Sequence, residues 1–291
     1  MFTVRNAERL RLETETGNVA IHVGAPGSVR YEVQIQVDSR EPDAQRAVDD
    51  FQVQGVQRPM LVVLTGRSME FRRHARLWVS YDVTVPSAMR VEVITHAGNI
   101  RVDGTASNVS LDSDGGDISV GRITGPARLV TKGGHIIAGD IGGDLHAETL
   151  GGHITVANVG GDAVLTTGGG HIHAGRISGA AQLDTGGGNV YVESAGSRVT
   201  ASSAGGLISF GEAAGAIQAH TSGGGIRVLR VAGPMQLDSN GGSILLTQVD
   251  NQVRASTGAG SITAWFVPNA KLQNASELQS GQGDILVYVP R

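Results

Sequence analysis

The sequence lacks cysteine altogether, and only 4% of its 291 residues are aromatic. Without cysteine the chain has no disulfide, no thiol nucleophile and no cysteine-based zinc site, and it suits an oxidising or a reducing compartment equally. Because aromatic residues are scarce, valine, isoleucine, leucine and alanine must fill the core of a chain that is 40% hydrophobic. Proline is also rare, with 8 residues, which excludes a collagen-like or proline-rich disordered composition.

A strong excess of charge of one sign is missing as well. The net charge of -4 provides no basic field, so we expect no nucleic-acid partner. No apolar run approaches the ~18 residues of a membrane-spanning helix, so we expect no direct membrane span. The N-terminal segment has no apolar stretch of the signal-peptide kind. We therefore expect a cytoplasmic protein, or an envelope or extracellular protein whose export signal is missing from this sequence.

Glycine, in contrast, is abundant, with 43 residues, and ten of them recur at a constant interval of 18 positions. These glycines are Gly98, Gly116, Gly134, Gly152, Gly170, Gly188, Gly206, Gly224, Gly242 and Gly260. An aliphatic residue follows each of them two positions later, from Ile100 to Ile262. A fixed period of this size is typical of a solenoid, in which each repeat packs on its neighbours.

The pattern within each repeat predicts strands. If the recurrent glycine is position 8, then positions 1, 3, 10, 12 and 15 are mostly apolar and position 5 is always Thr or Ser. This alternation predicts two strands with inward faces, a glycine corner between them, and a second turn over positions 13 to 18. A helix is excluded because an interior glycine costs about 1 kcal/mol and these glycines recur throughout.

We therefore predict an all-β fold, a parallel β-helix (β-solenoid) with 18-residue coils. Residues 91–270 are predicted to form ten coils, residues 1–90 an N-terminal β-rich cap around an interrupted first coil, and residues 271–291 a degenerate last coil. A short helix is expected within residues 42–51. Two other solenoids fit poorly. A hexapeptide helix needs an inward aliphatic residue every six positions, and a calcium-binding roll needs aspartates where Ala138 and Val156 stand.

One family resembles this sequence. The run VSYDVTVP at 79–86, the run GNIRV at 98–102 and the serial T-x-G-G-x-I-x-V units are similar to the bacterial "putative adhesin" family of β-strand-repeat proteins. The resemblance covers nearly the whole chain. It implies a right-handed, single-stranded parallel β-helix, usually associated with the cell envelope, and it implies no catalytic residue.

Histidines form the main candidate for a metal site. The candidates are His135, His153 and His171 at position 9 of three successive repeats, and His173 on the same face. Side chains in such a row stack about 4.8 Å apart, and clustered imidazoles bind zinc, nickel or copper. The alternative is a surface ladder of like residues, which Asp117 and Asn189 continue. We favour the ladder and expect no cofactor.

Carboxylates at position 4 are the candidates for catalysis. They are Asp112, Glu148, Asp184 and Asp238. Two repeats separate Glu148 from Asp112 and from Asp184, or about 9.6 Å, at the edge of the range of inverting glycoside hydrolases. No basic partner lies between them, and Tyr191 is nearly the sole aromatic residue on the repeat faces. We therefore expect a protein that is not an enzyme and has no catalytic residue.

The function that the sequence favours is an adhesin-like solenoid of the cell envelope or surface, which binds or displays an unidentified ligand through its outward faces. One alternative is a cytoplasmic β-helical scaffold that self-associates end to end, because the chain stops at VYVPR without a capping segment. A carbohydrate-active enzyme is another. Trp265 and Phe266 are candidate interface residues, unless they pack against the C-terminal insertion.

Overall fold

The structure is a computed structural model that describes residues 2–3, 8–38, 40, 43–69, 77–105, 107–268, 270, 272 and 275–290. It is an all-β solenoid of about 10 turns with about 18 residues per coil, which confirms the predicted fold class. The chain divides into two compact units, residues 1–142 and 143–291. These units cut across the predicted domain boundaries, which stay predictions.

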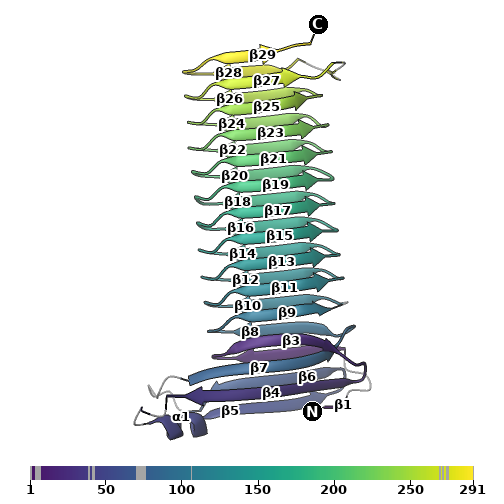
Figure 1. Cartoon of the computed structure of the whole chain (residues 1–291), viewed down its shortest axis with the longest axis vertical. Coiled ribbons are helices and arrows are strands. Elements are labelled where there is room, and N and C mark those ends of the chain that lie inside the picture. The colour runs from purple at the N-terminus through teal and green to yellow at the C-terminus, as the bar shows by residue number, and fades with distance from the viewer. Residues whose placement is uncertain are drawn as a thin grey trace. The chain divides into compact units, whose positions relative to one another are not determined.

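All elements described in the first unit are strands except one short helix (Figure 1). Its elements are β1 (Phe2–Thr3), β2 (Arg9–Thr14), β3 (Asn18–Gly24), β4 (Ser28–Val37), α1 (Ala44–Asp50), β5 (Phe51–Arg58), β6 (Leu61–Ser68), β7 (Leu77–Pro86), β8 (Arg90–Thr95), β9 (Ile100–Thr105), β10 (Val109–Ser113), β11 (Ile118–Ile123), β12 (Ala127–Thr131) and β13 (Ile136–Ile141). Helix α1 confirms the short helix expected there.

Two sheets build this unit, in the orders β1-β4-β7-β3-β9-β11-β13 and β5-β6-β2-β8-β10-β12. Strands β4 and β5 pair antiparallel with β7 and β6, whereas the coil strands pair in parallel. The coil of β2 and β3 therefore lies between the coil of β6 and β7 and the coil that begins at β8. The antiparallel strands cover one edge of each sheet, as a β-rich cap should.

Tyr81 fills the interior of this cap. Its ring is buried, its hydroxyl lies 2.9 Å from Oγ1 of Thr14, and burial raises the pKa of Tyr81. Gly66 provides the space, because a Cβ atom there would overlap with the Tyr81 hydroxyl. The coil of β6 and β7 thus packs around a large aromatic side chain, as a regular coil of the second unit does around Phe210.

Regular coils make up the second unit. Its strands are β14 (Leu145–Thr149), β15 (Ile154–Val159), β16 (Ala163–Thr167), β17 (Ile172–Ile177), β18 (Ala181–Thr185), β19 (Val190–Ala195), β20 (Val199–Ser203), β21 (Ile208–Ala213), β22 (Ile217–Thr221), β23 (Ile226–Val231), β24 (Met235–Ser239), β25 (Ile244–Val249), β26 (Val253–Thr257), β27 (Ile262–Phe266), β28 (Glu277–Ser280) and β29 (Ile285–Tyr288). Odd-numbered strands form one parallel sheet and even-numbered strands form the other. In the last coil Ile285 pairs with Ile262, so a short insertion precedes it.

The inward rows are those that the sequence predicts. In the coil of β18 and β19, Leu183, Thr185 and Val192 are at most 5% exposed. The predicted turn over positions 13 to 18 is too long, however, because the odd-numbered strands continue to position 15. Ile177, at this position, is fully buried, and its packing against the core holds the end of the strand in place.

The glycine corner is a hydrogen-bonded unit. Thr185 Oγ1 donates to the carbonyl of Gly170 in the preceding coil (2.7 Å) and accepts from the amide of Gly188 (3.1 Å). A Cβ atom on Gly188 would overlap with the same carbonyl oxygen. Position 5 therefore satisfies buried backbone groups, and position 8 admits only glycine.

Candidate functional site

The histidine row is bonded to the backbone of the following coil. His153 Nδ1 accepts a hydrogen bond from the amide of His171, and His171 Nδ1 accepts one from the amide of Asn189, both at 2.8 Å. The two rings stack with centroids 4.9 Å apart and an interplanar angle of 5°. The predicted stacking is thus confirmed for this pair.

Asparagine and aspartate do the same at other positions of this row. Asn99 Oδ1 accepts from the amide of Asp117 (2.8 Å), and Asn189 Oδ1 accepts from the amide of Leu207 (2.9 Å). A row of aspartates does so at the second turn, where Asp162 Oδ1 accepts from Ala180 at 2.7 Å. What these side chains share is an acceptor atom of suitable reach, which explains why histidine alternates with asparagine and aspartate.

This bonding limits what the histidines can offer to a metal. The bonded Nδ1 is unprotonated and occupied, so Nε2 carries the hydrogen in the neutral ring. His173 stacks on Tyr191 instead, with centroids 4.8 Å apart, and His135 belongs to the first unit. Among the residues that the structure describes, no group of three or more His, Asp or Glu could hold a metal ion. The preference for a surface ladder over a metal site at these histidines stays a prediction.

The position-4 carboxylates have neighbours that explain them without catalysis. Thr166 pairs with both Glu148 and Asp184 and so stands between them. Asp184 accepts a hydrogen bond from Gln182 (3.0 Å). Asp238 stands opposite His220 in the pairing of strands β22 and β24. Asp112 belongs to the first unit. These contacts give no acid and base that face each other across a cleft.

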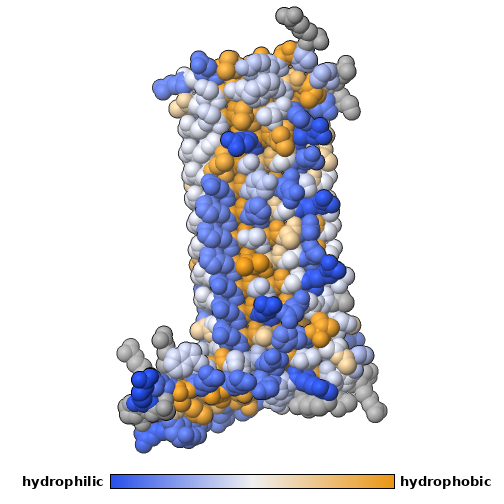
Figure 2. Space-filling model, viewed as in Figure 1, coloured by the Kyte–Doolittle hydropathy of each residue, from blue (hydrophilic) through white to orange (hydrophobic). Residues whose placement is uncertain are grey.

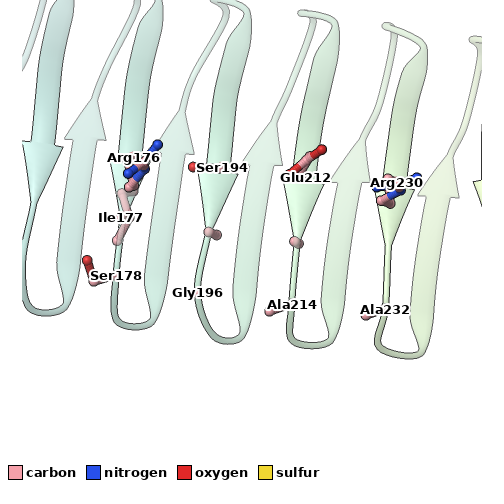
Figure 3. Close-up of a pocket in the computed structure, with 11 residues that line it drawn as sticks. Arg176, Ile177, Ser178, Ser194, Gly196, Glu212, Ala214, Arg230 and Ala232 are labelled. Carbon is pink, nitrogen blue, oxygen red and sulfur yellow. The ribbon is translucent and has the colours of Figure 1, made fainter.

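A groove on the second unit brings together charged and small side chains (Figure 3). Arg176, Ser194, Glu212 and Arg230 stand at position 14 of the successive strands β17, β19, β21 and β23, each paired with the next. The turns that follow these strands contribute small residues, among them Ser178. The groove has a volume of about 470 Å³, within the range of small-molecule sites.

Small side chains line the middle of the groove. Position 15 is Ile177 and Val231 in the two outer coils of the groove, but Ala195 and Ala213 in the two middle coils. Both alanines are 5% exposed, whereas Ile177 and Val231 are fully buried. The middle of the groove is therefore an apolar floor without large side chains.

The charged side chains that line the groove form no ion pair with one another. Neither Arg176 nor Glu212 makes an ion pair or a side-chain hydrogen bond with any described residue, and Arg230 Nε donates to Gln248 Oε1 (2.6 Å). In the first unit, by contrast, Arg122 at the same position pairs with Asp140 in the next coil (3.2 Å). The groove therefore presents a cation, an anion and a second cation in order.

Sequence reasoning missed this groove. Its position-14 residues form no motif, and they lie on four strands at intervals of 18 residues. A signal was nevertheless present in the sequence. At position 15, Ala195 and Ala213 of two successive coils interrupt a row that is otherwise mostly isoleucine and valine. A search for breaks in each inward row would have found it.

The candidate interface residues pack within their own unit. The Trp265 ring stacks on Tyr288 in the last coil, with centroids 4.9 Å apart and an interplanar angle of 7°. Phe266 pairs with Val249, and both Trp265 and Phe266 are half-buried. In the last coil, Ile285 and Val287 are 41% and 45% exposed.

Outward side chains vary from coil to coil. On the face that Figure 2 shows, columns of hydrophilic residues follow the coils beside hydrophobic strips. No helix in the described parts of the chain is long and apolar enough to cross a membrane.

Comparisons find similar solved structures but little similarity of sequence. A "putative adhesin" from Bacteroides fragilis is 14% identical, with 99% of this chain and 94% of that chain covered, at a TM-score of 0.34. A "putative adhesin" from Parabacteroides distasonis is 12% identical, with 98% and 94% covered, at a TM-score of 0.29. No protein-family model and no curated protein matches the sequence.

Proposed function

We propose that this chain is a non-enzymatic, adhesin-like β-solenoid of the bacterial cell envelope or surface, which binds a ligand through its outward faces. The groove on the second unit is the observation that carries the proposal. Its position-14 residues differ from coil to coil, and Arg176 and Glu212 are charged residues that form no ion pair with any described residue.

The inward residues support the same proposal because they are buried in the core and cannot contact a ligand. Positions 1, 3, 10 and 12 fill the core, and the position-5 hydroxyls satisfy the glycine corner. Recognition therefore falls to the outward rows, as it does on other solenoid scaffolds. The sequence resemblance to envelope-associated adhesin-like proteins gives the expected location.

Protease treatment of intact cells that express the full native gene product tests the location. We expect external protease to remove the solenoid while a cytoplasmic marker protein stays intact, with cell lysates as the control for cleavability. Protection in intact cells together with cleavage in lysates would overturn the surface location.

Self-association through the last coil is a second candidate function. Ile285, Leu286, Val287 and Tyr288 are each between 41% and 49% exposed, and contiguous apolar surface of this kind marks interaction sites. Sedimentation velocity over a wide range of protein concentrations tests it. A concentration-dependent dimer that Val287→Lys abolishes is expected, and a monomer at every concentration would overturn it.

A further inference from the structure

We propose that the groove over β17, β19, β21 and β23 binds an acidic saccharide, a uronate-containing disaccharide unit. The inference rests on the proposed binding function and names the ligand class for its site. The sugar carboxylate pairs with Arg176, and hydroxyl groups of the adjacent ring donate to Glu212.

The anion-binding end of the groove is Arg176. Its side chain is exposed, forms no ion pair with any described residue, and lies beside the hydroxyl-bearing Ser194 of the next coil (Figure 3). A guanidinium group binds a carboxylate through two parallel hydrogen bonds. The Ser194 hydroxyl adds a donor for a remaining lone pair of the carboxylate.

Glu212 determines which kind of anion fits. It stands two coils from Arg176, at about 9.6 Å by strand spacing, and it also lacks an ion pair among the described residues. Its negative charge opposes an anionic group placed over the middle of the groove, and Arg230, its register neighbour, lies beyond it. A carboxylate accepts hydrogen bonds, so neutral hydroxyl groups are the favoured partners at this end.

The floor suits the apolar face of a sugar ring. Ala195 and Ala213 form an apolar surface without large side chains between the two charged ends. Aromatic residues are missing from the groove lining, so no ring stacks on the sugar. We therefore expect weak affinity at one groove, with a dissociation constant of about 1 mM.

An extended peptide is disfavoured as a ligand because the strands under the groove have no unpaired edge. Strands β19 and β21, under the middle of the groove, are paired with a parallel strand on both sides. No free edge remains there for the main-chain hydrogen bonds by which extended peptides add to sheets. Hydroxyl groups that bond to side chains avoid this requirement.

A titration of the isotope-labelled full chain, followed by amide resonances, tests the inference. The probe is glucuronosyl-β-1,4-glucose, and cellobiose is the matched neutral disaccharide. We expect saturable shifts at residues 176, 194 and 212 with the acidic probe, and binding about tenfold weaker or more with cellobiose, because the charge-assisted bond is missing.

Three variants locate the site. Arg176→Gln should weaken binding of the acidic probe about tenfold, whereas Arg122→Gln, at the equivalent position of the first unit, should leave it unchanged. Ala213→Val fills the floor with the residue type that stands at position 15 in the next coil (Val231). This variant should abolish binding without lowering the melting temperature, since the row accepts valine elsewhere.

Each of the other possible results overturns one part of the saccharide proposal. Equal binding of both disaccharides overturns carboxylate recognition, and saturable binding of an acidic peptide with no binding of the sugar overturns the ligand class. Failure of every probe to shift residues 176, 194 and 212 overturns the groove as a site. None of these results depends on protease accessibility in intact cells, so the surface proposal is judged separately.

Discussion

The two turns of each coil in the second unit differ in how much variation they tolerate. At the glycine corner, Thr185 and Gly188 are fixed by buried hydrogen bonds and by the carbonyl of Gly170. Beside the opposite turn, the last residue of the odd-numbered strand changes from Ile177 to Ala195 without loss of the strand. The corner maintains the fold, and the variation at this strand end allows a groove.

The largest effect is expected from a side chain at the corner. Gly188→Ala should lower the free energy of unfolding by about 3 kcal/mol or more, because the new Cβ must displace the backbone of the preceding coil. Gly187→Ala is the matched control, since a Cβ there meets its nearest atom at 4.0 Å. Urea unfolding measures both. Equal stability of the two variants would show that the corner is not closely packed.

Removal of the corner hydroxyl should have the next largest effect. Thr185→Val keeps the shape of the side chain but leaves a carbonyl and an amide without their partner, at a cost of about 1–3 kcal/mol. Thr185→Ser retains the hydroxyl, as Ser203 does in the following coil, and should stay near the parent chain. A Val variant as stable as the Ser variant would refute the role of the hydroxyl.

The acceptor row should contribute less, because its bonds are exposed. His171→Ala removes the acceptor for the Asn189 amide and should cost about 0.5–1 kcal/mol. Faster hydrogen exchange at that amide is the direct measurement. His171→Asn restores an acceptor that the row already uses and should restore the protection. Unchanged exchange in the Ala variant contradicts this account.

The smallest effect is expected at outward ion pairs. The hydrogen bond from Arg101, with a smaller effect of His22, lowers the pKa of Asp103. A lowered folded-state pKa stabilises the protein above the unfolded pKa, and this contribution is lost as pH falls through the folded value. Asp103 is 40% exposed, so Asp103→Asn should cost less than about 1 kcal/mol. A larger loss at neutral pH, or one that persists in acid, would contradict this assignment.

The sequence predicted the coils well because their period is enforced by packing and by backbone bonds. Alternating burial identified the inward rows, including the Thr and Ser row that holds the corner. The order of the first coils was not predictable, because the coil of β2 and β3 lies between segments that come later in the chain. Nothing in the local sequence of residues 9–24 indicates that this coil lies between two later ones.

The candidate site was less predictable for a different reason. Arg176, Ser194 and Glu212 come together only through stacking, and each is an ordinary surface residue in its own coil. The histidine row was visible in the sequence, but the sequence did not show that the Nδ1 atoms of His153 and His171 accept hydrogen bonds from the next coil. Side-chain type alone does not distinguish a ligand from a hydrogen-bond acceptor.

Because the acceptor and corner bonds repeat every 18 residues, the number of coils can change without loss of these bonds. Because His171 bonds to the residue 18 positions onward, deletion of residues 171–188 joins a position-8 glycine to a position-9 asparagine and leaves every neighbour of the right type. Gene duplication or loss in steps of one repeat would thus change the number of coils while each junction stays compatible. The same deletion removes Arg176, so a change in the number of coils also changes the residues that line the groove.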